Sequence, residues 1–505
     1  MHMRPLLAPI LAFLAIWAPP SVLVVRAETV VLRFASTSVS INSTLDSVAA
    51  PILPGAEIAY QLNNLDLYIY RLDNNTDPAV FCEILEEDLS VVLCELSTGV
   101  SVHADPTSQS VAVSDPLGYQ QWALNATGVS GLWAGGLRGA GAKICVIDTG
   151  FDLTHPDLNG SLWTNPNSTA PDKHGISILR SVRGTDIQDQ NGHGTFVSGV
   201  IAAVTNNSIG VAGIAPDAKI IVCRFMDAGG GGDTADALSC WDYCLSKGAQ
   251  VLQNSWGGFV YSASFGFAAQ AVQSLGALVV ASAGNGAENT DLTEHTPSTI
   301  SRNFKNALSV ANMNSGFALS PNSNYGNVTV QLAAPGTVVT GLGLGGTYVN
   351  RSGTSMAAPQ VSAGAALLLQ YLAEQGINTY GSKIAASIVA DALVNSTVQM
   401  AVPTSVWKVN RGGYLYLPAA LARAKLLLSS QKTSTSNIGG YAIAFVVGCV
   451  CTLIVTLGVV YAMRVIRRRR AAETASDADA GAHATDAGRE TPDARRVPGI
   501  ELSSL

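Results

Sequence analysis

The 505-residue sequence contains few charged side chains. Asp, Glu, Lys and Arg make up 13% of the chain, about half of the roughly 25% that is usual in globular proteins. The 29 basic residues are outnumbered by 36 acidic residues, so the net charge is −7. Binding to nucleic acid requires concentrated positive charge that neutralises phosphates. This composition excludes nucleic acid as a partner.

Histidine is also scarce, and none of the seven histidines has a spacing to cysteine that suits a zinc site. The eight cysteines fall into three groups: Cys82 and Cys94, then Cys145, Cys223, Cys240 and Cys244, and finally Cys449 and Cys451. The even numbers of the first two groups favour disulfides in an exported protein. The second group allows three pairings. A bond between Cys240 and Cys244, one helical turn apart, would constrain little, whereas a bond from Cys223 to either would tie a strand to a helix.

Long apolar runs are confined to two places, the first of which begins the chain. An apolar stretch from Leu6 to Trp17 follows His2 and Arg4 and leads to small residues that end at Ala27. This pattern predicts a cleaved secretory signal peptide over residues 1–27. Pro9 interrupts the stretch and Pro19 and Pro20 follow it closely, which argues against the alternative of a membrane anchor. Nine Asn-x-Ser/Thr sequons support export as a glycoprotein: Asn42, Asn74, Asn125, Asn159, Asn167, Asn206, Asn327, Asn350 and Asn395.

The second apolar run, residues 438–463, contains no charged side chain and is long enough to cross about 30 Å of hydrocarbon as a helix. Arg464 and residues 467–470, all arginine, follow it. Positive charge beside a span marks the cytoplasmic side. We therefore expect a single-pass type I protein of the secretory pathway or cell surface, with a disordered cytoplasmic tail at 464–505. A buried core helix is the alternative, but four glycines in this uncharged run fit it poorly.

Between these runs, short apolar segments alternate with helix-like segments, a pattern typical of α/β proteins with a parallel sheet. The clearest predicted strands are Lys143–Ile147, Ile220–Phe225, Gln250–Gln253 and Ala277–Ser282. The clearest predicted helices are Thr234–Lys247 and Phe265–Leu275.

Three motifs in this region carry residues for nucleophilic catalysis. Ser355 lies in a Gly-Thr-Ser-Met-Ala-Ala-Pro run at 353–359, where a glycine-led turn exposes a hydroxyl at the start of a helix. Asp148 lies in Val-Ile-Asp-Thr-Gly and His193 in Asn-Gly-His-Gly-Thr. In the order Asp, His, Ser, these residues would supply an orienting carboxylate, a general base and a nucleophile.

These motifs resemble the catalytic motifs of the subtilisin-like serine proteases, the subtilases. The Ala-Ser-Ala-Gly-Asn run at 281–285 resembles the family segment whose asparagine, here Asn285, donates to the oxyanion. The resemblance covers Asp115 to Leu428. It implies a doubly wound α/β fold, with a mainly parallel sheet sandwiched by helices. It also implies an endopeptidase that cleaves protein or peptide substrates through an acyl-enzyme, without a catalytic cofactor.

Other interpretations of these residues compete with this one. Asp-Thr-Gly also occurs in pepsin-like aspartic proteases, but they need two such sites and this chain has one. Singly, Asn285 could end a strand, His193 could be a loop residue and Ser355 a helix N-cap. A catalytically silent membrane protein that binds others through its cleft is the alternative function. A third possibility is an enzyme whose only reaction is self-cleavage.

The segment before the catalytic domain has its own alternation of elements. Its predicted strands and helices are Thr29–Phe34, Ser43–Ile52 (helix), Leu65–Arg71, Asp77–Asp88 (helix) and Ser90–Leu96. The resemblance implies an inhibitory α+β prodomain at 28–104, self-cleavage near a processing linker at 105–114, a catalytic domain at 115–428 and a stalk at 429–437. The alternative is a stable accessory domain.

Two further sets of residues follow from the resemblance. The substrate cleft would be lined by Ser255, Trp256, Gly257, Gly229, Gly230 and Gly231, where glycines permit close approach of an extended peptide. A structural calcium ion would be held by oxygen atoms of Asp157, Asn207, Ile209 and Val211. Both glycine segments could equally be ordinary loops. The loop before Asn207 is one residue longer than the family pattern, and a glycan on Asn206 would crowd the calcium site.

The chain departs from the family pattern at two places. Phe196 replaces the second histidine of His-Gly-Thr-His, and Pro-Gln-Val-Ser-Ala follows the nucleophile in place of Pro-His-Val-Ala-Gly, which displaces the glycine to Gly364. Neither position performs chemistry in the family. The departures concern helix packing near Ser355 and not the three catalytic groups.

Overall fold

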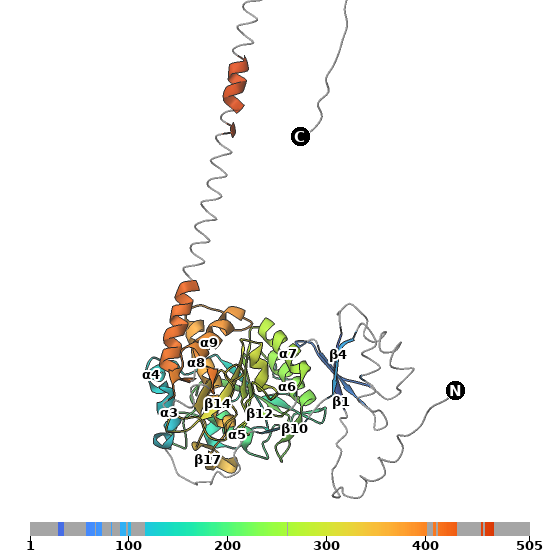
Figure 1. Ribbon diagram of the computed structural model, residues 1–505, viewed down its shortest axis with the longest axis vertical. Coiled ribbons are helices and arrows are strands. Elements are labelled where there is room, and N and C mark those ends of the chain that lie inside the picture. The colour runs from blue at the N-terminus through green and yellow to red at the C-terminus, as the bar shows by residue number, and fades with distance from the viewer. Residues whose placement is uncertain are drawn as a thin grey trace, which may run out of the picture. The chain divides into compact units, whose positions relative to one another are not determined.

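The computed structural model describes residues 29–34, 57–65, 67–72, 82, 91–96, 99–102, 117–259, 261–400, 408–410, 413–431, 456–457 and 460–468. The chain divides into two compact units, Met1–Leu428 and Ser429–Leu505 (Figure 1). In the second unit, the described residues 456–457 and 460–468 are helical. All the sheets and the candidate site belong to the first unit.

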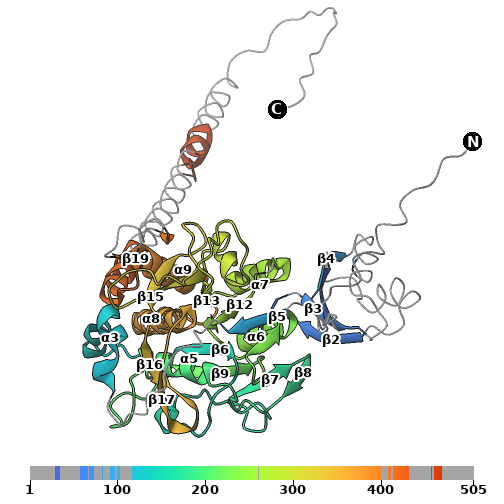
Figure 2. The same cartoon turned by 60° about the horizontal axis from the view of Figure 1, so that its bottom comes forward.

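A ten-stranded sheet forms the centre of the first unit, in the order β18-β19-β15-β14-β13-β11-β6-β9-β7-β8 (Figure 2). Its strands are β6 (Lys143–Asp148), β7 (Gly175–Leu179), β8 (Val182–Gly184), β9 (Lys219–Arg224), β11 (Val251–Asn254), β13 (Leu278–Ser282), β14 (Ala307–Met313), β15 (Leu332–Pro335), β18 (Val398–Gln399) and β19 (Gly413–Tyr414). The eight strands from β19 to β7 pair in parallel. Only β8 and β18, at the two ends, pair antiparallel. The mainly parallel sheet confirms the predicted α/β class.

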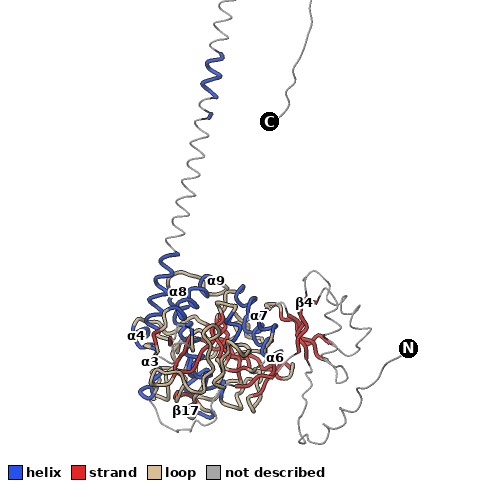
Figure 3. Tube along the Cα trace, viewed as in Figure 1, coloured by secondary structure: helices blue, strands red, loops and turns tan. Residues whose placement is uncertain are grey.

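Helices cover both faces of this sheet (Figure 3). The α-helices are α3 (Trp122–Thr127), α4 (Val129–Ala134), α5 (His193–Ala202), α6 (Thr234–Ser246), α7 (Ala263–Ser274), α8 (Thr354–Glu374) and α9 (Lys383–Asn395), and residues 417–431 are also helical. Short 3-10 turns occupy Gly118–Gln120, Pro156–Leu158, Ser298–Arg302 and Leu344–Gly346. Side chains of α5, α8 and α9 pack in one core, whereas those of α6 and α7 pack in the other.

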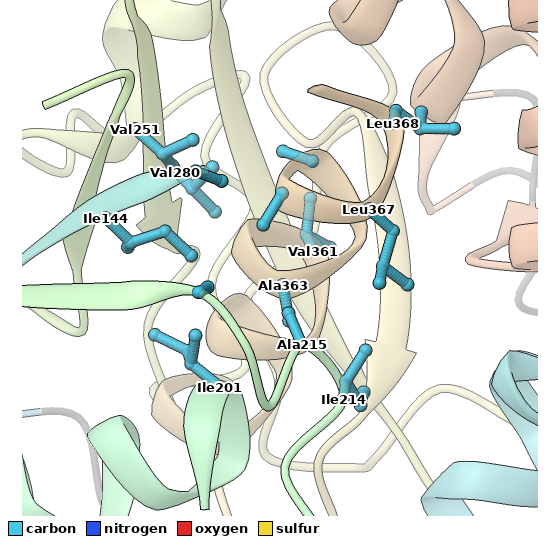
Figure 4. Close-up of a cluster of buried hydrophobic side chains, with 14 of the residues drawn as sticks. Ile144, Ile201, Ile214, Ala215, Val251, Val280, Val361, Ala363, Leu367 and Leu368 are labelled. Carbon is cyan, nitrogen blue, oxygen red and sulfur yellow. The ribbon is translucent and has the colours of Figure 1, made fainter. Parts of the chain in front are cut away.

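The sequence of β6 shows how one strand serves both cores. Ile144 and Val146 lie in the core beneath α8, whereas Cys145 and Ile147 lie in the core beneath α6 and α7. Successive side chains of a strand point to opposite faces, so a strand covered on both sides must be apolar throughout. Figure 4 shows Ile144 with Val251 and Val280, from neighbouring strands, beside the α8 helix. Such a strand therefore appears in the sequence as a continuous apolar run, without alternation of apolar and polar residues.

The predicted elements of the catalytic region agree with the observed ones to within two residues. For example, the strand expected at Gln250–Gln253 is β11, and the helix expected at Phe265–Leu275 is the later part of α7. In the preceding segment, β1 (Thr29–Phe34), β2 (Glu57–Leu62), β3 (Leu67–Arg71) and β4 (Val91–Leu96) form an antiparallel sheet in the order β2-β3-β1-β4. The helices expected at 43–52 and 77–88 lie outside the described residues, apart from residue 82, which is helical.

This small sheet packs on α6 and α7 of the catalytic region. Apolar residues of β1 and β3 join the core beneath these helices. The backbone N–H of Asn64 donates to Oδ1 of Asp242 at 2.7 Å, and the Asn64 side-chain amide also donates to that oxygen, at 3.1 Å. Arg71 donates to the carbonyl of Ser181 at 2.7 Å. Burial raises the pKa of the Asp242 carboxyl, which these hydrogen bonds and the nearby Arg183 partly oppose.

Among the residues that the structure describes, no helix has the length and apolar character needed to cross a bilayer. Most of the span expected at 438–463 lies outside the described residues, as do the signal peptide at 1–27, the linker at 105–114 and nearly all of the tail.

Three disulfides join the cysteines of the first two groups. They are Cys82–Cys94, Cys145–Cys244 and Cys223–Cys240. The last two resolve the three pairings that the sequence left open, and they fasten α6 to β6 and β9.

We expect the two α6 disulfides to contribute unequally to stability. Cys145–Cys244 closes a loop of 99 residues and Cys223–Cys240 one of 17. A longer loop loses more entropy when it is closed in the unfolded chain, and the difference is about 1.6 kcal/mol. Urea unfolding of the Cys145→Ser/Cys244→Ser variant should therefore give a lower free energy of unfolding than that of Cys223→Ser/Cys240→Ser. Equal losses would show that loop closure does not set these contributions.

Candidate active site

The acid and the base of the predicted triad meet at the carboxyl ends of the parallel strands. Asp148 is the last residue of β6 and His193 is the first residue of α5. Gly192, with φ 92°, takes the left-handed conformation that brings the chain into α5. Nδ1 of His193 lies 2.8 Å from Oδ1 of Asp148, and both side chains are buried. A carboxylate on Nδ1 leaves Nε2 as the basic nitrogen.

Ser355 is joined to Ser255 by two reciprocal hydrogen bonds. Oγ of Ser355 donates to the carbonyl of Ser255 at 2.9 Å, and Oγ of Ser255 donates to the carbonyl of Ser355 at 2.8 Å. The second bond is possible because Pro359, inside α8, lacks the N–H that would otherwise bond to this carbonyl. Gly353 has φ 147°, a conformation that places Ser355 at the beginning of α8. Sequence analysis did not assign Pro359 or the Ser255 carbonyl a role.

Asn285 follows β13, and the hydrogen bonds of its side-chain amide are made by the oxygen and not by the nitrogen. Its Oδ1 accepts hydrogen bonds from the backbone N–H and the hydroxyl of Thr354, at 2.9 and 3.2 Å. Its Nδ2 is buried and has no hydrogen-bond partner. Oδ2 of Asp148 and Nε2 of His193 are likewise buried without a partner. Buried polar atoms are nearly always paired, so these three atoms, which belong to predicted site residues, are available to bind another molecule.

A further polar residue, Asp189, organises the turn that presents His193. Its Oδ1 accepts from the backbone of Asn191 and Gly192 and from the hydroxyl of Thr149, and its Oδ2 accepts from the backbone and hydroxyl of Thr195. Asp189 is buried, and it connects the segment after β6 with the start of α5. Sequence analysis did not assign it a role. The sequence feature that could have identified Asp189 is its position two residues before Asn191, just ahead of a helix, because aspartate at such positions caps turns.

The predicted cleft segments form a small sheet with a strand of the preceding segment. Strand β5 (Gly99–Val102) lies between β10 (Gly231–Asp233) and β12 (Trp256–Gly257) and is antiparallel to both (Figure 2). Gly231 and Gly257 both pair with Ser101, and Trp256 pairs with Val102. An extended segment therefore already occupies the two edges that sequence analysis assigned to substrate.

The individual cleft residues contribute in different ways. Trp256 presents its backbone to β5, while its buried indole donates to the carbonyl of Ile147 at 2.8 Å and belongs to the core. Gly229 and Gly230 lie before β10 and do not pair with β5. Gly229 instead belongs to a turn, in which its N–H donates to Asp227 at 2.9 Å.

Hydrogen bonds bring together the four residues expected to bind calcium. Oδ1 of Asp157 accepts from Nδ2 of Asn207 at 2.7 Å, and Oδ2 accepts from the backbone N–H of Val211 at 2.8 Å. The Asn207 oxygen accepts from the N–H of Ile209 at 2.9 Å and does not face Asp157. Burial raises the pKa of the Asp157 carboxyl. Hydrogen bonds join the two loops, and we assign no step to calcium.

The departure at Phe196 is accommodated by neighbouring residues. Phe196 is fully buried in a small cluster with Val200, Val339 and Met356. Gly341 makes room for it, because a Cβ at this position would lie 2.7 Å from the ring. The guanidinium of Arg351 lies over the same ring, 5.8 Å from its centroid. The aromatic side chain therefore fits the helix packing beside Ser355.

Comparisons with known proteins agree with this arrangement. The subtilase family model matches residues 139–418, more than half of the chain. Subtilisin-like protease 1 of Plasmodium berghei (strain Anka) is 32% identical over 310 residues, which cover 56% of this chain and 50% of the relative. Subtilisin-like protease 1 of Plasmodium falciparum (isolate 3D7) is 34% identical over 255 residues, which cover 45% of this chain and 37% of the relative. Thermitase of Thermoactinomyces vulgaris is 34% identical over 259 residues, 51% of this chain and 83% of the relative.

The chain thus spans about half the length of the Plasmodium berghei relative, while the matched region contains all of the motif residues at 148, 193, 285 and 355. Taken together with the parallel sheet and the paired Asp148 and His193, the match shows that this chain belongs to the subtilase family.

Proposed function

We propose that this chain is a serine endopeptidase that hydrolyses peptide bonds of protein substrates through an acyl-enzyme. The observation that best supports this function is the Asp148–His193 pair, in which Nε2 of His193 is buried without a partner. Nδ2 of Asn285 is likewise buried without a partner, and Oδ1 of Asn285 is hydrogen-bonded to Thr354, the residue before Ser355. A protein that only binds peptides through its cleft does not need to keep a base and a hydrogen-bond donor buried and unsatisfied at the same point.

In the proposed reaction, rotation of the Ser355 side chain transfers its hydrogen bond from the Ser255 carbonyl to Nε2 of His193. His193 takes the proton as Oγ attacks the substrate carbonyl, and later returns it to the leaving amine. Asp148 holds the imidazole in the required tautomer. The oxyanion receives hydrogen bonds from Nδ2 of Asn285 and from the N–H of Ser355, which has no acceptor within the helix because it lies in the first turn of α8.

This proposal predicts how two variants react with a fluorophosphonate probe and a peptide substrate. Ser355→Ala should lose labelling and turnover completely. Asn285→Ala should lose turnover by about 100- to 1,000-fold, because one oxyanion donor is removed, while its Ser355 remains able to react. Gln273→Ala, an exposed change on α7 away from the site, is the matched control and should behave as the wild type. A processed wild-type protein that neither labels nor cleaves peptides would favour the silent binding protein.

We also propose that the enzyme is made as a zymogen whose prodomain blocks the cleft. Strand β5 supports this, because it makes with β10 and β12 the main-chain pairing that an extended substrate would make. The chain runs from Ser101 to Val102 along β12 towards Ser255, whose carbonyl contacts Oγ of Ser355. Continued by one residue, this register would bring the chain to the nucleophile, so the proposed scissile bond is that between His103 and Ala104.

Determination of the mature N-terminus tests the zymogen proposal. Wild-type protein expressed as the full chain should begin at Ala104 after processing, whereas Ser355→Ala should retain the preceding segment as one uncut chain. A mature N-terminus several residues away from Ala104 would contradict the register. Removal of the segment from Ser355→Ala in purified form would show that another protease makes the cut.

Export and membrane attachment remain proposals that the sequence alone supports. The predicted signal peptide at 1–27, the sequons and the uncharged run at 438–463 place the catalytic domain in the lumen or outside the cell. In cells, the full chain should stay with membranes in alkaline carbonate and shift in size with N-glycosidase. A chain truncated after residue 437 should be released while keeping its glycans. Carbonate extraction of the full chain would contradict the anchor, and an unchanged size would contradict glycosylation.

A further inference from the structure

A buried chain of polar groups joins β11 to two points of α8. Oγ of Ser362 donates to Oε1 of Gln253 at 2.5 Å, and Nε2 of Gln253 donates to Oγ of Ser255 at 2.7 Å. Oγ of Ser255 in turn donates to the carbonyl of Ser355 at 2.8 Å. All four residues are fully buried, with 0% of their surface exposed, so solvent cannot take the place of a missing partner.

The geometry of the strand and of the helix brings these groups together. Gln253 lies on β11 two residues after Val251, which packs in the core beside α8 (Figure 4), and side chains two apart on a strand point to the same face. Ser362 follows Ser355 by two turns of α8, so these two serines lie on the same face of the helix. Gln253 therefore holds α8 twice, directly at Ser362 and through Ser255 at Ser355.

Ser362 is one of the positions at which the chain departs from the family pattern. It stands where that pattern has alanine, in the Pro-Gln-Val-Ser-Ala run that follows the nucleophile. An alanine there would leave Oε1 of Gln253 buried without a partner, and an unpaired buried acceptor destabilises a protein by more than an ordinary hydrogen bond stabilises it. The departure thus supplies the hydroxyl that the glutamine needs, and two further hydrogen bonds connect it to Ser355.

Pro359 fixes the direction of this chain of hydrogen bonds. If the Gln253 amide were turned over, Oε1 would face Ser255, whose hydroxyl would then donate to it and leave the carbonyl of Ser355. Because Pro359 has no N–H to offer this carbonyl, the carbonyl would remain buried without a donor. Of the two amide orientations, only the one in the structure gives every group in the chain a partner.

We infer that Ser362 and Gln253 are positioning residues that hold Ser355 in its reactive place. Both act through Ser255, and neither takes part in the proton transfer. Without the Ser362 hydroxyl, the amide of Gln253 is free to turn over, and the carbonyl of Ser355 then loses its donor. The first turn of α8, which carries the nucleophile and the oxyanion N–H, is held less firmly as a result. This inference rests on the proposed endopeptidase function.

The test measures kcat and KM for a peptide substrate, and the rate of fluorophosphonate labelling, in Ser362→Ala. Turnover and labelling should both fall by about tenfold, the factor that corresponds to the loss of one hydrogen bond. KM should stay within about twofold, because the edges of β10 and β12 that would bind the peptide are unchanged. Gln253→Met keeps a side chain of similar length, removes both hydrogen bonds of the amide and should lose at least as much turnover. Adding Ser362→Ala to Gln253→Met should cause no further loss, because the chain is already broken.

The matched control is Ser239→Ala, which should keep the wild-type turnover. Ser239 is a fully buried serine of α6, and its hydroxyl has no hydrogen-bond partner in the part of the chain that the structure describes. If Ser362→Ala and Gln253→Met lower the melting temperature but leave kcat and the labelling rate unchanged, the two residues serve packing alone and the inference is wrong. Additive losses in the double variant also overturn it.

Two further outcomes are separated by the same measurements. Should Gln253→Met fail to fold, the comparison of kcat with KM in Ser362→Ala decides alone. If processed wild type neither cleaves the peptide nor reacts with the fluorophosphonate, the proposed function itself fails.

Discussion

The reciprocal hydrogen bonds between Ser255 and Ser355 are the constraint on which the site depends. Each hydroxyl donates to the carbonyl of the other residue, so the residue before β12 and the start of α8 cannot move independently. Gln253 donates to the Ser255 hydroxyl at 2.7 Å and accepts a hydrogen bond from Ser362, one turn beyond Pro359. This buried chain of polar groups fixes the nucleophile relative to the peptide-binding edge before any substrate arrives.

The sheet supplies the remaining alignment. Asp148 ends β6 and Asn285 follows β13, while His193 and Ser355 begin the helices α5 and α8. In parallel α/β sheets these carboxyl ends meet along one edge, where ligands bind. The two disulfides of α6 and the small sheet of the preceding segment lie on the other core. The helices that carry His193 and Ser355 and the two disulfides of α6 thus lie on different faces of one sheet.

The sequence predicted the fold and the main chemical groups because each depends on local signals. Apolar runs predicted the bounds of the strands to within about two residues, and glycine-flanked motifs identified Asp148, His193 and Ser355 as the candidate catalytic residues. Contacts between distant segments could not be predicted in this way. The pairing of Cys145 with Cys244, the role of Asp189 and the approach of Arg351 to Phe196 all arise from tertiary packing. The calcium prediction was transferred from the family and stays a prediction, and Asp157 accepts hydrogen bonds from Asn207 and Val211.

The preceding segment touches the catalytic region at two separate places, through β5 in the cleft and through the β1–β4 sheet on α6 and α7. After the proposed cut, it would be a bivalent inhibitor, in which each contact keeps the other at a high effective concentration. Dissociation then requires both contacts to open together. A second cleavage between β4 and β5 would remove this avidity, and the onset of activity would follow the rate of that event.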